Sequence, residues 1–184
     1  MFKNSFKFYL QAPVLVVAVF VMTLNGFGQS DAKKEEIAKD AAEAKAEFIK
    51  SDPKMAALFA NAYGYAIFPN VGKGAVGVGG AAGNGVAWEK GVEVGTASLK
   101  QVSIGFQWGG QAYREVIFFE GKENMDRFKA NKIELSAQVS AVAVKSGASA
   151  NAKYVDGVMV FTMQKGGLMY EAAVGGQKFK FEKK

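Results

Sequence analysis

Two patterns of apolar residues predict helices in the first third of the chain after residue 30. Residues 31–50 consist mainly of Ala, Glu and Lys and contain neither Gly nor Pro, a composition that favours a helix. Ser30 or Asp31 can cap it. Its apolar positions recur at spacings of three and four and form one narrow stripe. The stripe consists of Ile37, Ala41, Ala44 and Phe48.

A second helix is predicted to follow Ser51-Asp52-Pro53, because Pro is tolerated in a first helical turn and the residues before it can cap. It extends to about Ala62, and Gly64 is expected to end it. Its apolar set is fuller than that of the first helix, so we expect it to lie against the core. That set is Met55, Leu58, Phe59 and Ala62.

From Tyr65 onward the apolar period changes to two and Gly becomes frequent, which predicts strands separated by turns. A short helix is predicted over Glu123–Lys129, and a last strand has Phe179 and Phe181 on one face. Residues 133–141 alternate apolar and polar side chains, which is typical of a half-buried strand. Lys165-Gly166-Gly167 is expected to join two strands as a hairpin. The other predicted strands are 65–68, 75–79, 85–88, 98–108, 114–120, 158–164 and 168–174.

These elements predict an α+β fold. About eight short strands follow the two N-terminal helices without β-α-β alternation, which favours an antiparallel, barrel-like or sandwich-like sheet. We expect an N-terminal helix over residues 29–50 and one β-rich domain over residues 51–184.

Residues 1–28 have the pattern that is typical of a secretory signal peptide. Lys3 and Lys7 precede an apolar run, Val14–Leu24, and small residues follow before Gln29. The run is shorter than the roughly 20 residues that a membrane-spanning helix needs. We therefore expect an exported protein of the periplasm or cell envelope, or a secreted one. The alternative is an anchor that is kept, with Phe8–Leu24 as one span.

The amino-acid composition limits which partners the protein is expected to bind and which chemistry it is expected to perform. The formal charge is +6, and removal of the two lysines in residues 1–28 leaves +4, without an Arg-rich block, which disfavours nucleic acid as a partner. The chain has no Cys, which excludes a lipidated cysteine, and it has no His. Its acids are scattered, without the spacing of a metal site or a carboxylate pair. We therefore predict a protein that is not an enzyme and holds no metal or cofactor.

Gly72–Gly77 matches the letters of a dinucleotide-binding motif, G-x-G-x-x-G. That motif requires a helix after the glycines, whereas more glycines follow here, so we reject it. Gly77 and Gly79 instead leave one face of a strand bare, either for a bend that closes a barrel or for a ligand. Trp88 or Trp108 could cover that face. We predict structural roles for Gly72, Gly74, Gly77, Gly79 and Gly80.

Lysines near Phe179 and Phe181 could form a cationic surface for anionic lipid. The alternative is that they only guard an edge strand against pairing with other chains. The candidates for lipid binding are Lys73, Lys178, Lys180, Lys183 and Lys184.

Three parts of the sequence together resemble the SYLF domain, a lipid-binding family also called an actin-binding domain after its yeast members. The first is Ala-Ile-Phe-Pro-Asn-Val-Gly-Lys-Gly at 66–74, with Gly-Val-Gly-Gly at 77–80 and Gly-Asn-Gly-Val at 83–86. The others are Ser-Ile-Gly-Phe-Gln-Trp-Gly-Gly-Gln at 103–111 with Glu-Val-Ile-Phe-Phe at 115–119, and Lys-Gly-Gly-Leu at 165–168. The resemblance covers about residues 51–181.

The resemblance implies a non-enzymatic domain that binds membranes, with a preference for phosphoinositides in eukaryotic members. In those members an N-terminal amphipathic helix contributes to lipid binding, whereas residues 31–50 here carry six acids against five lysines. Residues 31–50 are therefore not favoured as a helix that binds anionic lipid. The resemblance as a whole implies a peripheral domain on an anionic lipid surface. The alternative is an envelope or secreted scaffold that binds a protein through its sheet. A third possibility is an apolar cavity that carries an acyl chain.

Overall fold

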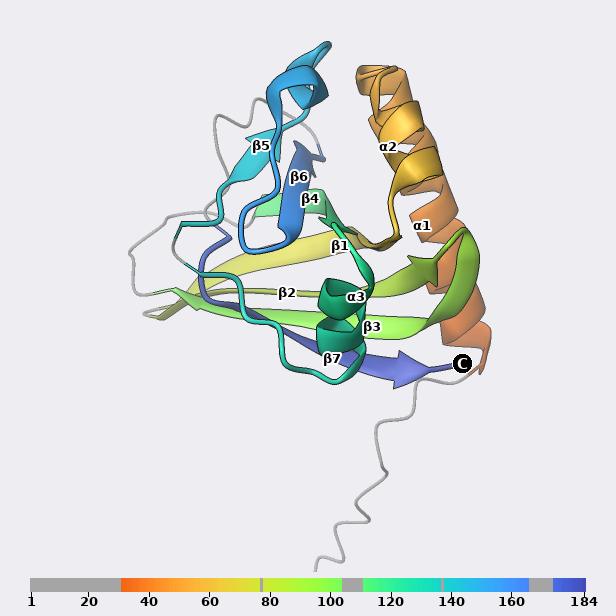
Figure 1. Cartoon of the computed structure of the whole chain (residues 1–184). Coiled ribbons are helices and arrows are strands. Elements are labelled where there is room, and N and C mark those ends of the chain that lie inside the picture. The colour runs from red at the N-terminus through yellow and green to blue at the C-terminus, as the bar shows by residue number, and fades with distance from the viewer. Residues whose placement is uncertain (1–30, 77, 104–110, 137, 166–173) are drawn as a thin grey trace, which may run out of the picture.

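The computed structural model describes residues 31–76, 78–103, 111–136, 138–165 and 174–184, and its α+β architecture confirms the predicted class. Figure 1 shows the helices and the curled sheet. The helices are α1 (Asp31–Ser51), α2 (Met55–Asn61), α3 (Lys122–Lys129) and the 3-10 turn η1 (Ala148–Asn151). The strands are β1 (Gly64–Val76), β2 (Val78–Glu89), β3 (Val92–Ser103), β4 (Gln111–Phe119), β5 (Ala141–Ala143), β6 (Val158–Gln164) and β7 (Gln177–Lys183).

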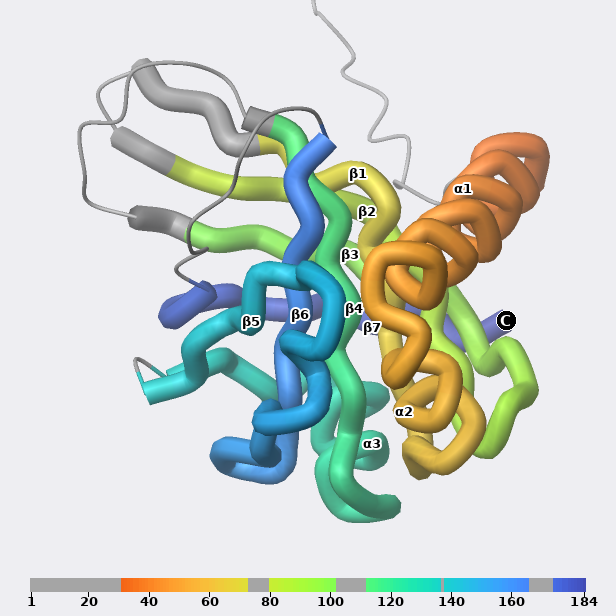
Figure 2. Tube along the Cα trace, turned by 90° about the horizontal axis from the view of Figure 1, so that it is seen from above, coloured from red at the N-terminus to blue at the C-terminus, as the bar shows by residue number. Residues whose placement is uncertain are grey.

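Helix α1 lies against β1 and β2, with its charged side facing solvent (Figures 1 and 2). The four predicted stripe residues, from Ile37 to Phe48, are its buried residues, which confirms the periodicity argument. Lys45 adds a polar anchor that the sequence did not indicate. Its Nζ donates a hydrogen bond of 2.9 Å to the Tyr65 hydroxyl and lies 5.0 Å from the centre of the Phe59 ring.

Helix α2 begins at Met55 and ends at Asn61. Met55 and Phe59 are buried, which confirms that this helix lies against the core. The prediction that Gly64 ends α2 is wrong, because the chain is already extended at Ala62 and Gly64 is the first residue of β1. A Cβ atom at Gly64 would lie 2.8 Å from the Met125 Sδ, so close packing accounts for this glycine.

The seven strands form one sheet in the order β5-β6-β4-β1-β2-β3-β7, antiparallel except for the β5–β6 pair. In the described residues its two edge strands do not pair with each other, so the sheet is open, and the predicted barrel-like or sandwich-like arrangement is not confirmed. The strand predicted over residues 75–79 is wrong. Val76 ends β1 and pairs with Val78, the first residue of β2, so this segment belongs to two antiparallel strands.

The open sheet nevertheless curls strongly. Strand β7 is separated from β4 by three strands in the sheet order. Even so, the Gln177 Nε2 of β7 donates a hydrogen bond of 3.0 Å to the Glu115 Oε2 of β4. The rings of Phe68 in β1 and Phe179 in β7 have centres 5.7 Å apart. The sheet therefore has a concave inner face across which its strands touch, and a convex outer face.

Both faces of the central strands are buried. Phe119 and Phe128 belong to the core on the inner face, with ring centres 4.8 Å apart. Phe118 and Phe161 belong to a second core that the sheet shares with α1 and α2. A strand that is buried on both faces has an almost continuous run of apolar residues in its sequence. This explains why residues 116–119 and 158–161 contain no polar residue.

Residues 133–141 do not form the regular strand that their alternation predicted. The alternation of burial itself is correct, because Ile133, Leu135, Val139 and Ala141 are buried; Ala137 lies outside the described residues. Leu135 exchanges backbone hydrogen bonds with residues next to and in β7, whereas β5 pairs with β6 at the opposite edge. The segment crosses between the two edges, so it cannot keep one continuous ladder.

The helix predicted over Glu123–Lys129 is confirmed as α3. The predicted strands 65–68, 85–88 and 158–164 lie within β1, β2 and β6, and the first part of the predicted 98–108, residues 98–103, lies in β3. Strand β4 covers all of the predicted 114–120 except its last residue. The end of the predicted strand 98–108 and the hairpin that follows Lys165 lie largely outside the described residues, as does the predicted signal peptide. Those expectations stay predictions.

Candidate functional site

A straight row of small and basic residues crosses the outer face of the sheet. It consists of Ala112 in β4, Gly72 in β1, Ala82 in β2, Lys100 in β3 and Lys178 in β7, each paired in register with the next. All five are exposed. Facing residues of antiparallel neighbours have Cβ atoms about 4.5–5.5 Å apart. Lys100 and Lys178 therefore lie side by side, next to positions with no side chain longer than a methyl group. We call these five residues the lysine row.

The parallel row beside it is polar. It consists of Asn70, Asn84, Ser98 and Lys180, which pair in register across β1, β2, β3 and β7. At one end of it, the Asn70 Nδ2 donates a hydrogen bond of 2.9 Å to the Asp40 Oδ2 of α1. Helix α1 therefore borders this face on the β1 side, and the open part of the face lies over β3 and β7.

The structure divides the predicted lipid-binding lysines into separate groups. Lys178 and Lys180 are exposed on β7 while Phe179 between them is buried, as the alternation predicted. Lys183 and Lys184 instead line a pocket beside the first turns of α1. Lys73 pairs in register with Ala81, one position away from the lysine row, so the backbone does not place it in that row.

Lys100 is a site residue that sequence reasoning did not select. Leu99 beside it is buried, and this alternation assigns Lys100 to the outer face. Its position opposite Lys178 depends on the pairing of β3 with β7, two segments far apart in the chain. No local pattern in the sequence carries that information.

Three of the predicted lysines form ion pairs at the surface. Lys178 lies 3.3 Å from Glu134, Lys180 lies 3.1 Å from Glu182, and Lys184 lies 3.0 Å from Glu93. Such pairs contribute about 0–1 kcal/mol when both partners are exposed, so they leave Lys178 and Lys180 available to another anion. Lys100 forms no salt bridge with the described residues.

The pocket beside α1 has a volume of about 440 Å³ and mixed charge. Its acidic lining residues are Asp31, Glu35, Glu93 and Glu182, and its basic ones are Lys34, Lys183 and Lys184. With both signs interspersed, it has no clear preference for a charged ligand.

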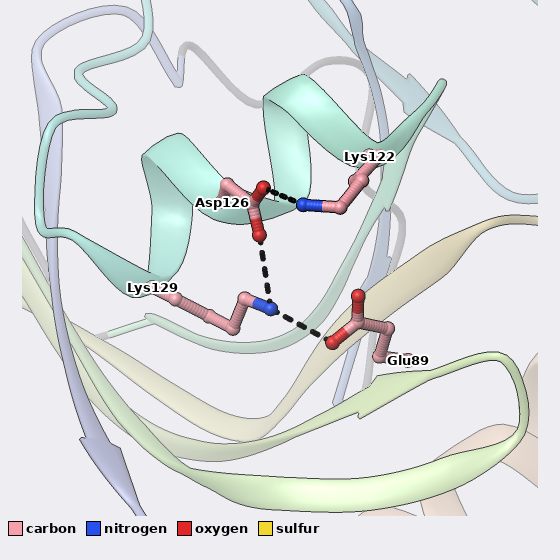
Figure 3. A network of polar contacts seen from close by, with 4 residues as sticks. All are labelled: Glu89, Lys122, Asp126 and Lys129. Atoms are coloured by element: carbon pink, nitrogen blue, oxygen red, sulfur yellow. Dashed lines mark hydrogen bonds and ion pairs between the residues drawn. The ribbon is translucent and has the colours of Figure 1, made fainter.

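A second polar cluster joins α3 to the end of β2 (Figure 3). Lys129 lies 2.8 Å from Glu89 and 3.1 Å from Asp126, which also pairs with Lys122. The hydrogen bond from Lys129 lowers the pKa of Glu89, and the same bond raises the pKa of Lys129. Each charge in this cluster has a partner within the chain, so we assign it to holding α3 in place.

A third polar cluster is buried inside the curl. Tyr113, Glu115 and Gln177 are all fully buried, and the Gln177 Nε2 lies 3.0 Å from the Glu115 Oε2 and 3.5 Å from the Tyr113 hydroxyl. Burial raises the pKa of the Tyr113 hydroxyl, and the neighbouring Glu115 carboxylate raises it further. The cluster holds β7 against β4 and is not exposed to a macromolecular partner.

The glycines fall into two groups. A Cβ atom at Gly72 would meet nothing within 4 Å, and one at Gly80 would lie 3.1 Å from the Gln101 carbonyl oxygen. Gly74 and Gly79 lie in β1 and β2, and Gly77 lies outside the described residues. The closest approaches to backbone atoms occur at glycines for which the sequence predicted no structural role. A Cβ atom would lie 2.2 Å from the Ile67 carbonyl oxygen at Gly85, and 2.2 Å from that of Glu182 at Gly95.

Within the described parts of the chain, no group of three or more acidic residues is arranged to hold a metal ion. Over the same residues, none of the helices combines the length and the apolar character that a membrane span requires.

Two comparisons with known proteins agree with the motifs. The family model Ysc84, described as "Las17-binding protein actin regulator", matches residues 100–184, which include the end of β3 and all of β4, β5, β6 and β7. The chain is also 31% identical to beta cell expansion factor A of Aeromonas veronii over 137 residues, or 73% of this chain. That stretch covers 52% of the relative, so the chain spans about half the length of the curated relative that it matches. Residues 100–184 therefore match the Ysc84 family model, which confirms the resemblance to the SYLF domain that the motifs predicted.

Proposed function

We propose that this protein is a non-enzymatic, peripheral membrane-binding domain that attaches to anionic lipid through the outer face of β3 and β7. The observation that carries the proposal is the position of Lys100, Lys178 and Lys180 on two neighbouring strands of one open sheet face. The match of residues 100–184 to the Ysc84 family model supports it, since the SYLF domain that the chain resembles is a lipid-binding family.

The shape of the face favours a broad partner over a small one. Over β4, β1 and β2 the lysine row has only Ala112, Gly72 and Ala82, so no long side chain separates the backbone from an approaching surface. A lysine close to an anionic membrane contributes about 1 kcal/mol. Three lysines would then contribute about 3 kcal/mol, or on the order of a hundredfold in affinity.

Vesicle sedimentation tests the proposal directly. Vesicles that contain phosphatidylglycerol should bind the protein, vesicles of phosphatidylcholine alone should not, and binding should fall as salt rises, because exposed charges are screened. The triple variant K100Q/K178Q/K180Q should lose most binding and keep the circular dichroism spectrum of the parent. If the parent binds no anionic vesicle at low salt, the proposal is wrong.

A charge-matched variant controls for the loss of three positive charges. Lys39 is exposed on α1, and Lys145 and Lys153 are exposed between β5 and β6, so none of the three belongs to β3 or β7. The triple variant K39Q/K145Q/K153Q should bind vesicles nearly as well as the parent. Equal losses in both variants would mean that net charge, and not the outer face of β3 and β7, determines binding.

The second candidate function is a scaffold that binds a protein through the same sheet. The small residues Ala112, Gly72 and Ala82, which pair in register across β4, β1 and β2, favour this candidate. Small residues allow another backbone to approach the sheet. The matched family is itself described as Las17-binding. This candidate takes precedence if the parent does not bind anionic vesicles.

We also propose that the protein is exported and acts in the cell envelope or outside the cell. The pattern of residues 1–28, in which two lysines precede an apolar run, supports export. N-terminal sequencing of the protein from the producing cells should begin within a few residues of Gln29. A retained Met1 would favour the membrane anchor instead.

A further inference from the structure

The side-by-side lysines of the lysine row indicate a ligand more specific than a negative surface. Lys100 and Lys178 face each other directly across the β3–β7 pair. Like charges in that position repel and destabilise a sheet. Lys178 has Glu134 as a partner at 3.3 Å, whereas Lys100 forms no salt bridge with the described residues. Two cations held side by side with one exposed carboxylate between them keep an excess of positive charge, which favours a ligand that carries two negative charges on one group.

We propose that Lys100 and Lys178 together bind the phosphomonoester headgroup of a membrane lipid, an inference that rests on the proposed membrane-binding function. A phosphomonoester carries about −1.5 to −2 charges near pH 7, which is enough to neutralise both ammonium groups. A phosphodiester headgroup carries a single charge on its phosphate and neutralises one of them.

The neighbouring residues suit the same group. Ser98 lies two positions along β3 from Lys100, on the same face, and Asn84 pairs with Ser98 in register. Their hydroxyl and amide groups are neutral donors for phosphate oxygens. On the other side of Lys100 lies Ala82, which leaves room above the strand. Lys180 pairs with Ser98 and not with a lysine, so it adds charge without forming a second pair.

The test compares two anionic lipids at matched surface charge. Phosphatidic acid has a phosphomonoester headgroup and phosphatidylglycerol has a phosphodiester, and the vesicles are adjusted to equal zeta potential. The parent should bind phosphatidic acid vesicles about fivefold more tightly, because one more lysine is neutralised. Equal affinity for the two lipids would overturn the inference and leave the proposed function standing. Absence of binding to both would refute the proposed function itself.

Single substitutions test which lysines cause the preference for phosphatidic acid over phosphatidylglycerol. K100Q and K178Q should each abolish the preference for phosphatidic acid while keeping salt-sensitive binding to phosphatidylglycerol. K180Q removes the same charge from the same face and is the matched control: it should weaken binding to both lipids equally and keep the preference. If K180Q loses the preference as fully as K100Q does, the facing pair is not the determinant and the inference fails.

A competition experiment separates lipid from free phosphate as the ligand. Inorganic phosphate is added at constant ionic strength while binding to phosphatidic acid vesicles is measured. Only weak competition is expected, because the headgroup is held at a surface to which Lys180 also binds. If inorganic phosphate displaces the protein from both kinds of vesicle at low concentration, the site is one for soluble phosphate and the lipid assignment is overturned.

Discussion

At the residue scale, the register of the sheet gives single side chains their roles. Gly72 and Gly85 illustrate this, since both lie in glycine-rich stretches and the sequence does not distinguish them. In the folded sheet, a methyl group at Gly72 would meet nothing within 4 Å, whereas one at Gly85 would meet the backbone of β1. The need for glycine at a position is therefore set by a neighbouring strand that local sequence does not identify.

The paired substitutions Gly85→Ala and Gly72→Ala test this difference. In Gly85→Ala, the new Cβ atom would lie 2.2 Å from the Ile67 carbonyl oxygen, so β1 and β2 must move apart. We expect a loss of about 1–3 kcal/mol in the free energy of unfolding, the usual cost of overpacking, and little change for Gly72→Ala. Urea denaturation measures both. A Gly85→Ala protein as stable as the parent would contradict the close approach.

Glu134 limits the anion affinity of the lysine row, because it pairs with Lys178 at 3.3 Å. We expect Glu134→Gln to bind anionic vesicles more tightly, by up to about fivefold, since one further lysine becomes available. Vesicle sedimentation at low salt measures the change. Glu120→Gln, at an exposed position beyond the end of β4, is the charge-matched control and should have a smaller effect. Equal gains in both variants would show that only net charge matters.

At the element scale, sequence reasoning succeeded where the determinants are local. The stripe of α1, the existence of α3 and the alternation of β7 each depend on residues close in the chain, and all three are confirmed. It failed for residues 133–141, where the burial pattern is correct but two different partner strands divide the segment. It could not predict the lysine row, because that site exists only through the pairing of β3 with β7.

The junction of α1 and α2 is held by one buried carboxylate. Asp52 is 1% exposed, and its Oδ2 accepts a hydrogen bond of 2.8 Å from the backbone N–H of Ser149 in η1. Its Oδ1 accepts a second bond, of 3.2 Å, from the N–H of Lys54. Burial alone would raise the pKa of Asp52, but these hydrogen bonds outweigh it and hold the pKa below its ordinary value of 3.8. The carboxylate therefore fixes both helices to the segment between β5 and β6.

Asp52→Asn should destabilise the protein by about 1–3 kcal/mol at neutral pH, because hydrogen bonds to a charged acceptor are replaced by weaker ones. The pH dependence has a definite sign. Since the folded-state pKa is lowered, the stabilisation is present above the ordinary pKa of 3.8 and is lost as the pH falls through the lower folded value. Thermal unfolding of parent and variant between pH 7 and pH 3 measures this. A difference between them that stays constant over that range would contradict the role of the charge.

At the scale of the whole molecule, the curl of the sheet determines which surface a membrane can meet. Contacts between β4 and β7 close the concave side around the inner core. The lysine row lies on the convex side, where α1 packs mainly over β1 and β2 and its first turns reach β3 and β7 only at the pocket lined by Thr96 and Glu182. A flat membrane touches a convex sheet along a strip, and the open strip over β3 and β7 carries Lys100, Lys178 and Lys180. Curvature and charge therefore favour the same orientation.

That orientation can be tested by labelling, because the chain contains no cysteine and each introduced thiol is unique. Ala82→Cys places a label within the lysine row, and Ala150→Cys places one on η1, in the segment between β5 and β6 at the far side of the molecule from β7 in Figure 1. Both positions are exposed. On anionic vesicles that contain a lipid-attached quencher, fluorescence should fall strongly for the label at position 82 and little for the label at position 150. Stronger quenching at position 150 would mean that the protein binds through its opposite side, and the lysine row would then have no part in membrane attachment.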